Sequence, residues 1–95
     1  MNLNDEKYPI LRILYDHKIS DDLFDEIEKA LNRAKYNVKL FGGGDYITHR
    51  GEYIGNCDFS ILNFKEFDYQ FSLEIISNII SSNFDCFIIE NDPIY

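Results

Sequence analysis

The sequence is poor in the residues that usually support metal binding, cross-linking or membrane insertion. It contains two cysteines, two histidines, two prolines, one methionine and no tryptophan. No stretch approaches the roughly 18 consecutive apolar residues that a membrane-spanning helix needs. The cysteines and histidines show no C-x-x-C or H-x-x-x-H spacing. We therefore predict no metal site and no cofactor.

Other absences bear on the compartment. Cys57 and Cys86 lie in apolar, strand-like runs, which predicts buried reduced thiols rather than a disulfide or a reactive thiol. The stretch from Met1 to Lys7 is polar and contains no apolar signal-peptide region. These observations predict a cytoplasmic protein without membrane contact.

Basic residues are scarce in the second half of the chain. The whole sequence has 17 acidic and 9 basic residues, for a formal net charge of −8, yet residues 52–95 contain eight acidic residues and a single basic one, Lys65. The negative electrostatic field of such a surface repels nucleic acid and attracts a basic protein, although the same charge also serves solubility. We predict no nucleic-acid binding.

Hydrophobic residues make up 45% of the chain and include eight Phe and seven Tyr. This is enough apolar material for one core, so residues 1–95 are predicted to form a single domain. Periodicity and capping residues predict these elements in order: a strand at Ile10–Tyr15, a helix starting at Ser20–Asp22, a short strand at Val38–Phe41, a hairpin around Arg50–Gly51, a helix at Tyr69–Ser82 and a strand at Phe84–Glu90. Five of the seven residues of the last run are apolar, which predicts an interior strand buried on both faces.

This element order predicts an α+β fold. Two helices would cover one face of a mainly antiparallel sheet of four or five strands, as a variant of the ferredoxin-like βαββαβ plan. Gly42-Gly43-Gly44 predicts a turn or a bulge that breaks or duplicates one strand. An anion site at the triplet is the weaker interpretation, because the following Asp45 repels phosphate. The second face of the sheet should be open to water.

A period of two over residues 52–61 places Glu52 and Asp58 on that open face. We predict a binding patch made of Glu52, Tyr53, Asp58, Glu66 and Asp68. Carboxylates beside aromatic rings suit a protein interface, although a solvated sheet face is the simpler interpretation.

The histidines do not predict an enzyme. Asp16 and His17 are sequence neighbours, and neighbours on a strand point to opposite faces. His49 and Cys57 flank the predicted hairpin turn, but Cys57 lies several pairs beyond the expected partner of His49. We predict no catalytic residues.

The overall profile resembles bacterial immunity proteins, the inhibitors of colicin-type toxins and of contact-dependent growth-inhibition toxins. The features that carry the resemblance are the Asp and Glu excess in 52–95, the abundant Tyr, Asn and Ile, and the helix-to-strand ending Ile79-Ile80-Ser81-Ser82-Asn83-Phe84-Asp85-Cys86-Phe87-Ile88-Ile89. The resemblance implies a monomer or weak dimer that binds a cognate protein toxin, expected to be a basic nuclease, and blocks its active cleft. The alternative function is a small ligand-binding regulatory domain of ferredoxin-like fold.

Overall fold

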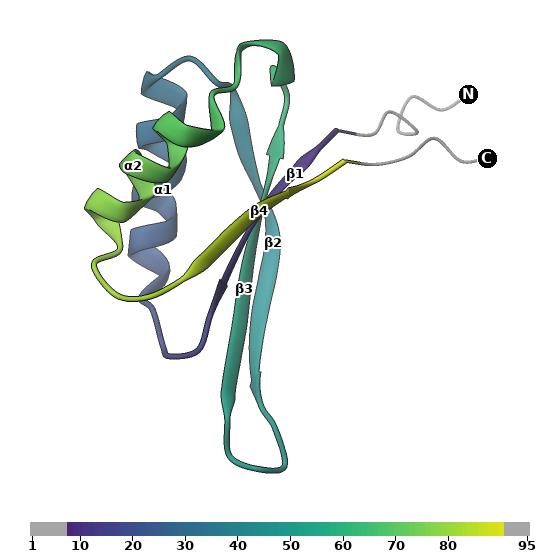
Figure 1. Cartoon of the computed structure of the whole chain (residues 1–95), viewed down its shortest axis with the longest axis vertical. Coiled ribbons are helices and arrows are strands. Elements are labelled where there is room, and N and C mark those ends of the chain that lie inside the picture. The colour runs from purple at the N-terminus through teal and green to yellow at the C-terminus, as the bar shows by residue number, and fades with distance from the viewer. Residues whose placement is uncertain (1–7, 91–95) are drawn as a thin grey trace, which may run out of the picture.

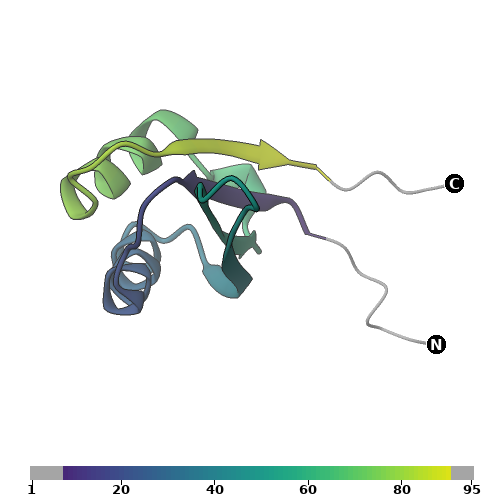
Figure 2. The same ribbon diagram turned by 90° about the horizontal axis from the view of Figure 1, so that it is seen from below.

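The computed structural model describes residues 8–90, which form one sheet and one layer of helices (Figure 1). The elements in order are β1 (Ile10–Tyr15), α1 (Asp21–Arg33), β2 (Val38–Ile47), β3 (Tyr53–Ile61), a 3-10 turn at Phe64–Glu66, α2 (Tyr69–Ile79) and β4 (Asp85–Ile89). The sheet order is β2-β3-β1-β4 and every neighbouring pair is antiparallel. Both helices lie on the same side of the sheet (Figures 1 and 2). This confirms the predicted α+β class and βαββαβ order.

Two predictions fall outside the part of the chain that the structure describes. They are a lead-in expected over Met1–Tyr8, of which the structure describes only Tyr8, and an end of the last strand expected at Asn91-Asp92-Pro93. Within residues 8–90, no helix has the length and apolar character that crossing a membrane requires.

Both helices begin at side chains that satisfy free backbone N–H groups. The Ser20 hydroxyl accepts from the Asp22 N–H at 3.3 Å, and the Asp68 carboxylate accepts from the Phe71 N–H at 3.0 Å. Lys35 and Asn37 adopt left-handed backbone angles just after α1, and this turns the chain into β2.

The core lies between the helices and the two central strands, β1 and β3. Leu11 faces Phe59 across the strand pair, and Ile13 faces Cys57; the four are 0–4% exposed. Each large apolar side chain buried in this way contributes about 1.5–3 kcal/mol. At the next pair, the Tyr15 ring packs so closely on Gly55 that a Cβ there would lie 2.2 Å from Tyr15 Cε2.

The prediction that the last strand is interior was wrong. β4 pairs only with β1 and forms one edge of the sheet. Cys86 and Ile88 pack against the core, while Phe87 on the opposite face is 39% exposed. An apolar run is compatible with burial on both faces, but its place in the sheet depends on which strands pair with β1. The interior positions belong to β1 and β3.

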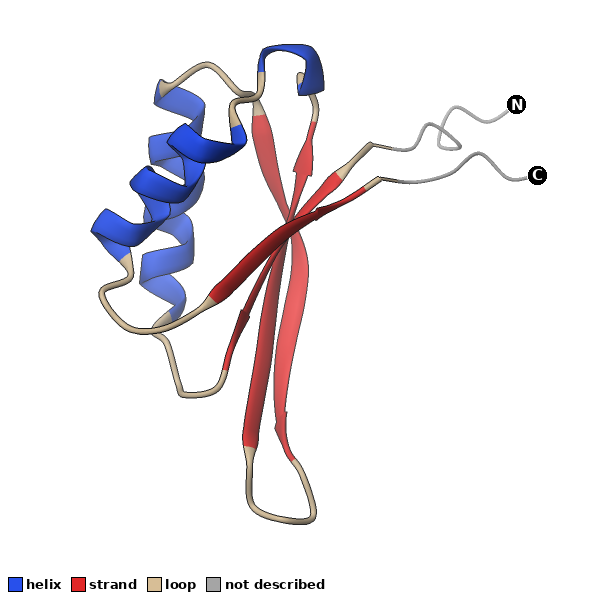
Figure 3. Ribbon diagram, in the orientation of Figure 1, coloured by secondary structure: helices blue, strands red, loops and turns tan. Residues whose placement is uncertain are grey.

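The glycine triplet neither breaks nor duplicates a strand. β2 runs through it from Val38 to Ile47, with a register shift between Leu40 and Gly42 that leaves Phe41 as an extra residue. The bulge interpretation is therefore the correct one. The β2–β3 hairpin projects well past the helices (Figure 3), and nine of the ten β2 residues are exposed.

Candidate functional site

Asp58, one of the five residues of the predicted patch, does not present a free charge. It faces Arg12 across the β1–β3 pair on the sheet face away from the helices. Arg12 Nε lies 2.8 Å from Asp58 Oδ1, and Arg12 Nη2 lies 2.7 Å from Oδ2. This bidentate bond raises the pKa of Arg12. Asp58 is on the predicted face, but it is only 6% exposed and its charge is neutralised.

The other four predicted residues are distributed over different parts of the molecule. Glu52 is exposed beside the hairpin turn, where its C=O accepts from the Thr48 N–H. Glu66 is exposed in the 3-10 turn, and Asp68 is the cap of α2. Tyr53 donates a hydrogen bond to Asp45 Oδ2, which raises the pKa of Tyr53 to about 12. The structure therefore does not assemble the five residues into one patch.

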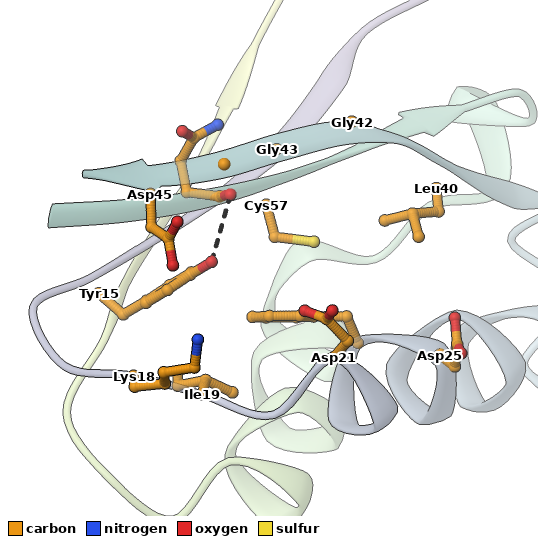
Figure 4. Close-up of a pocket in the computed structure, with 13 residues that line it drawn as sticks. Tyr15, Lys18, Ile19, Asp21, Asp25, Leu40, Gly42, Gly43, Asp45 and Cys57 are labelled. Carbon is orange, nitrogen blue, oxygen red and sulfur yellow. Dashed lines mark hydrogen bonds between the residues drawn. The ribbon is translucent and has the colours of Figure 1, made fainter.

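A groove of about 540 Å³ lies between the start of α1 and the middle of the β2–β3 hairpin (Figure 4). Its floor is the bare backbone of the glycine triplet together with Asn56 and Cys57. Phe24, Leu40, Ile19 and Tyr15 supply apolar surface, and the Tyr15 hydroxyl donates to the Asn56 C=O at 3.3 Å. The groove thus combines an apolar lining with exposed backbone.

Carboxylates outnumber cations around this groove. Asp21 and Asp25 on α1 and Asp45 on β2 line it, against the single ammonium of Lys18. The sequence places Lys29 one turn after Asp25, but within residues 8–90 the ion pairs are Arg12–Asp58 and Asp16–His17, so Asp25 has no cation partner. The groove therefore suits a cationic or hydrogen-bond-donating group next to an apolar one.

The thiols are not suited to act as nucleophiles. Burial raises the pKa of Cys57 to about 12, with further increases from Asp58 and from the α1 carboxylates. Burial alone raises the pKa of Cys86 to about 12. The thiolate is the reactive form of cysteine, so the Cys57 thiol serves as a small apolar group in the groove floor.

One hydrogen-bonded chain of side chains was missed from the sequence. His17 Nδ1 lies 2.9 Å from Asp16 Oδ1, and His17 Nε2 lies 2.6 Å from Ser82 Oγ. The expectation that Asp16 and His17 point apart was wrong, because both follow the end of β1 and lie in a bend. The contact with His17 lowers the pKa of Asp16.

The order Ser–His–Asp is that of a hydrolase triad, but the surroundings differ. The Asp16 side chain is 84% exposed, whereas a triad aspartate is buried so that it can hold the imidazole in one orientation without competition from water. The three residues tie the β1–α1 connection to the α2–β4 connection, and we assign them that structural role.

Among the residues that the structure describes, no group of three or more His, Cys, Asp or Glu side chains is placed to hold a metal ion. Comparisons of the chain with protein-family models, with curated proteins and with solved structures found no match. The groove must therefore be interpreted from its own chemistry.

The sequence contained part of the signal for this groove. Asp21, Asp25 and Glu28 follow one another at spacings of four and three residues, which places them on one side of a helix. In the sequence alone, Asp21 indicates only the start of a helix. That β2 would lie beside this side of the helix depends on the tertiary fold.

Proposed function

We propose that this protein is an immunity protein that binds and neutralises a basic protein toxin. The observation that carries the proposal is the groove itself, where Asp21, Asp25 and Asp45 lie around apolar side chains and a floor of exposed backbone. Interfaces that bind tightly combine apolar contact area with a few well-placed charges. No covalent chemistry is required of the chain, which acts as a binding protein and not as an enzyme.

The mechanism rests on charge complementarity. A toxin that cuts nucleic acid must hold phosphates, so its active cleft is basic. The carboxylates of the groove can contact such a cleft in place of phosphates, and the body of the protein then blocks access. The net charge of −8 adds long-range attraction, which accelerates encounter at low salt.

The predicted patch contributes unequally to this mechanism. Tyr53 supports the groove through its bond to Asp45. Glu52, Glu66 and Asp68 are exposed and add to the acidic field. Asp58 is excluded from direct charge recognition, because Arg12 already neutralises it. As an inhibitor of this type, the protein would act as a monomer or weak dimer in the cytoplasm of the cell that makes the toxin.

Capture of the toxin from the native cell tests the proposal. The tagged protein is expected to retain one basic protein, with less retained at moderate than at low salt, and the captured protein should lose nuclease activity when the inhibitor is added. Asp21→Asn combined with Asp25→Asn should weaken binding at least about tenfold, since close interfacial charge pairs are worth about 1.5 kcal/mol or more each.

A matched control removes the same number of charges elsewhere. Glu74 on α2 and Glu90 after β4 are exposed and do not line the groove. Glu74→Gln combined with Glu90→Gln should change the affinity less than about threefold. Equal losses for the two double variants would reduce the charge argument to net charge alone, and absence of any basic partner would refute the proposed function.

The groove volume also lies within the usual range of small-molecule pockets, which keeps the ligand-binding regulatory domain as the second candidate. That function predicts a stable homodimer and a small cationic ligand in the groove. Light scattering on the purified protein separates the two, because an inhibitor of the proposed type forms at most a weak dimer until the toxin is added.

A further inference from the structure

The outer edge of β2 is unusually open. β2 is an edge strand of ten residues that pairs only with β3. Three of its large hydrophobic side chains, those of Phe41, Tyr46 and Ile47, are 61–67% exposed. Exposed sheet edges are normally guarded by charged side chains, prolines, bulges or covering elements, because their free N–H and C=O groups can pair with another chain.

The first part of this edge is guarded by α1. Asn32 Oδ1 accepts from the Val38 N–H at 2.7 Å, and Glu28 Oε2 accepts from the Leu40 N–H at 2.7 Å. These two amides therefore point away from β3. The bulge between Leu40 and Gly42 comes next, and beyond it no side chain of α1 bonds to the strand among the described residues.

The ladder geometry identifies which backbone groups beyond the bulge are free. The Thr48 N–H donates to the Glu52 C=O at 2.8 Å, so these residues form a hydrogen-bonded pair. In an antiparallel ladder such pairs alternate with pairs whose N–H and C=O groups point outward. Counting back from Thr48, the outward groups belong to Ile47, Asp45 and Gly43. No hydrogen bond to them from outside the β2–β3 pair occurs in residues 8–90.

The one charged side chain in this segment is that of Asp45, which disfavours an acidic partner strand and not a basic one. From Gly42 to Ile47 there is no proline and no lysine, and three of the six residues are glycines. The bare backbone of Gly42 and Gly44 has nothing within 4 Å of the position that a Cβ would take. The face of the sheet away from the helices is therefore unobstructed beside Gly42 and Gly44, where side chains of an added strand would lie.

We propose that the β2 edge from Gly43 to Ile47 accepts an extended segment of the basic partner as a fifth strand of the sheet. This rests on the proposed function for the choice of partner. Backbone hydrogen bonds to the outward groups would supply affinity, and alternate side chains of the added strand would supply specificity. On the helix side, the side chains of the added strand would lie beside Asp45 and beside the groove that Asp21 and Asp25 line. These carboxylates favour Lys or Arg at those positions of the partner.

The opposite side of the added strand has a different character. There its side chains lie beside Gly44 and the exposed ring of Tyr46, which favours apolar residues. The occupant is therefore an extended segment in which basic and apolar residues alternate. A second copy of this chain fits less well, because each copy carries a net charge of −8 and antiparallel self-pairing at the glycines brings two Asp45 carboxylates to the same interface.

A short capped peptide of alternating Lys and Val serves as the probe. Added to the ¹⁵N-labelled protein, it should shift the amide signals of Gly43, Asp45 and Ile47 and leave those of β4 unchanged. Methylation of alternate peptide nitrogens should weaken binding at least about tenfold, since it removes the pairing hydrogen bonds and keeps the charge. Equal binding of the methylated peptide, or shifts confined to other elements, would overturn the proposal.

Two substitutions at one position separate backbone pairing from charge. Asp45→Asn and Asp45→Pro both remove the carboxylate, but only the proline removes the outward N–H, and proline is tolerated on an edge strand at such a position. Peptide binding should be at least about tenfold weaker for Asp45→Pro than for Asp45→Asn. If Asp45→Pro fails to fold, Ile47→Pro with Ile47→Val as its control removes the next outward N–H.

The same variants distinguish failure of this inference from failure of the proposed function. A toxin bound equally by Asp45→Pro and Asp45→Asn would overturn strand addition and leave the inhibitor role intact. Peptide binding that depends on the Asp45 N–H, with no toxin captured, would support strand addition and refute the inhibitor role. A homodimer that Asp45→Pro dissociates would assign the edge to a second copy and overturn the proposal.

Discussion

Replacement of Arg12 by Leu should be among the most destabilising substitutions on the open face of the sheet. It leaves the Asp58 carboxylate, whose side chain is 8% exposed, without its two bonds at 2.7 and 2.8 Å. Removing one partner of a fully buried ion pair costs about 3–5 kcal/mol, whereas an exposed pair is worth about 0–1 kcal/mol. The Arg12 side chain is 36% exposed, so water partly replaces it and we expect a loss of about 2 kcal/mol.

The reverse substitution should cost less. In Asp58→Val, the long Arg12 side chain can turn its guanidinium to water, so a loss of about 1 kcal/mol is expected. The double variant removes both charges and should lie within about 1 kcal/mol of the natural protein, because apolar pairs replace buried ion pairs at little cost.

Urea unfolding followed by circular dichroism measures all three free energies, and Arg12→Leu should also lower Tm by about 8–16 °C. If Arg12→Leu proves no worse than Asp58→Val, or if the double variant loses the sum of both, the assigned burial of Asp58 is wrong.

Two further predictions follow from the contacts of single residues. Gly43→Ala should destabilise the protein by about 1–3 kcal/mol, because its Cβ would lie 2.4 Å from the Asn56 carbonyl oxygen. Gly44→Ala is the control: a Cβ there has nothing within 4 Å, so the free energy of unfolding should change by less than about 1 kcal/mol in the same assay. Burial raises the pKa values of Cys57 and Cys86 from 9.0 to about 12. Both thiols should therefore resist iodoacetamide at pH 8 in the folded protein and react with it in urea, as measured by mass spectrometry. Rapid labelling of the folded protein would contradict this. Since the unfolded thiols ionise first, stability should also fall as the pH rises from about 9 towards 12.

The sequence predicted those parts of the fold that depend on local spacing. The alternation predicted in residues 52–61 is confirmed, because Cys57, Phe59 and Ile61 lie on the buried face of β3 while Asp58 lies on the other. In α1, Ile27 and Leu31 are four residues apart and both lie in the core. The order of the strands in the sheet did not follow from local spacing. The apolar run at the end of the chain has the composition of an interior strand, yet β4 lies at the edge because β1 takes β3 as its other neighbour.

Contacts between distant residues explain what the sequence could not supply about the site. The alternation of side chains along β3 places Asp58 on the face away from the helices. Neutralisation of the Asp58 charge, however, depends on a strand register that puts Arg12, 46 positions away, directly opposite. The same holds for Ser82 beside His17, 65 positions away. Charge counts identify residues 52–95 as the acidic half of the chain. The carboxylates of the groove, however, come from α1 and β2 in the first half, where acidic and basic residues are nearly equal in number.

Asp45 connects the two modes of recognition proposed for this protein. Its backbone belongs to the outward-pointing set of the β2 edge, and its carboxylate lines the groove. The bond from Tyr53 to Oδ2 holds that carboxylate in place before any partner arrives, leaving Oδ1 for a cation. A side chain fixed in advance loses less rotational freedom on binding, at a cost otherwise of about 0.5–1.5 kcal/mol. A partner strand in register with Asp45 would therefore be positioned by backbone pairing to place its basic side chain against a carboxylate that is already oriented.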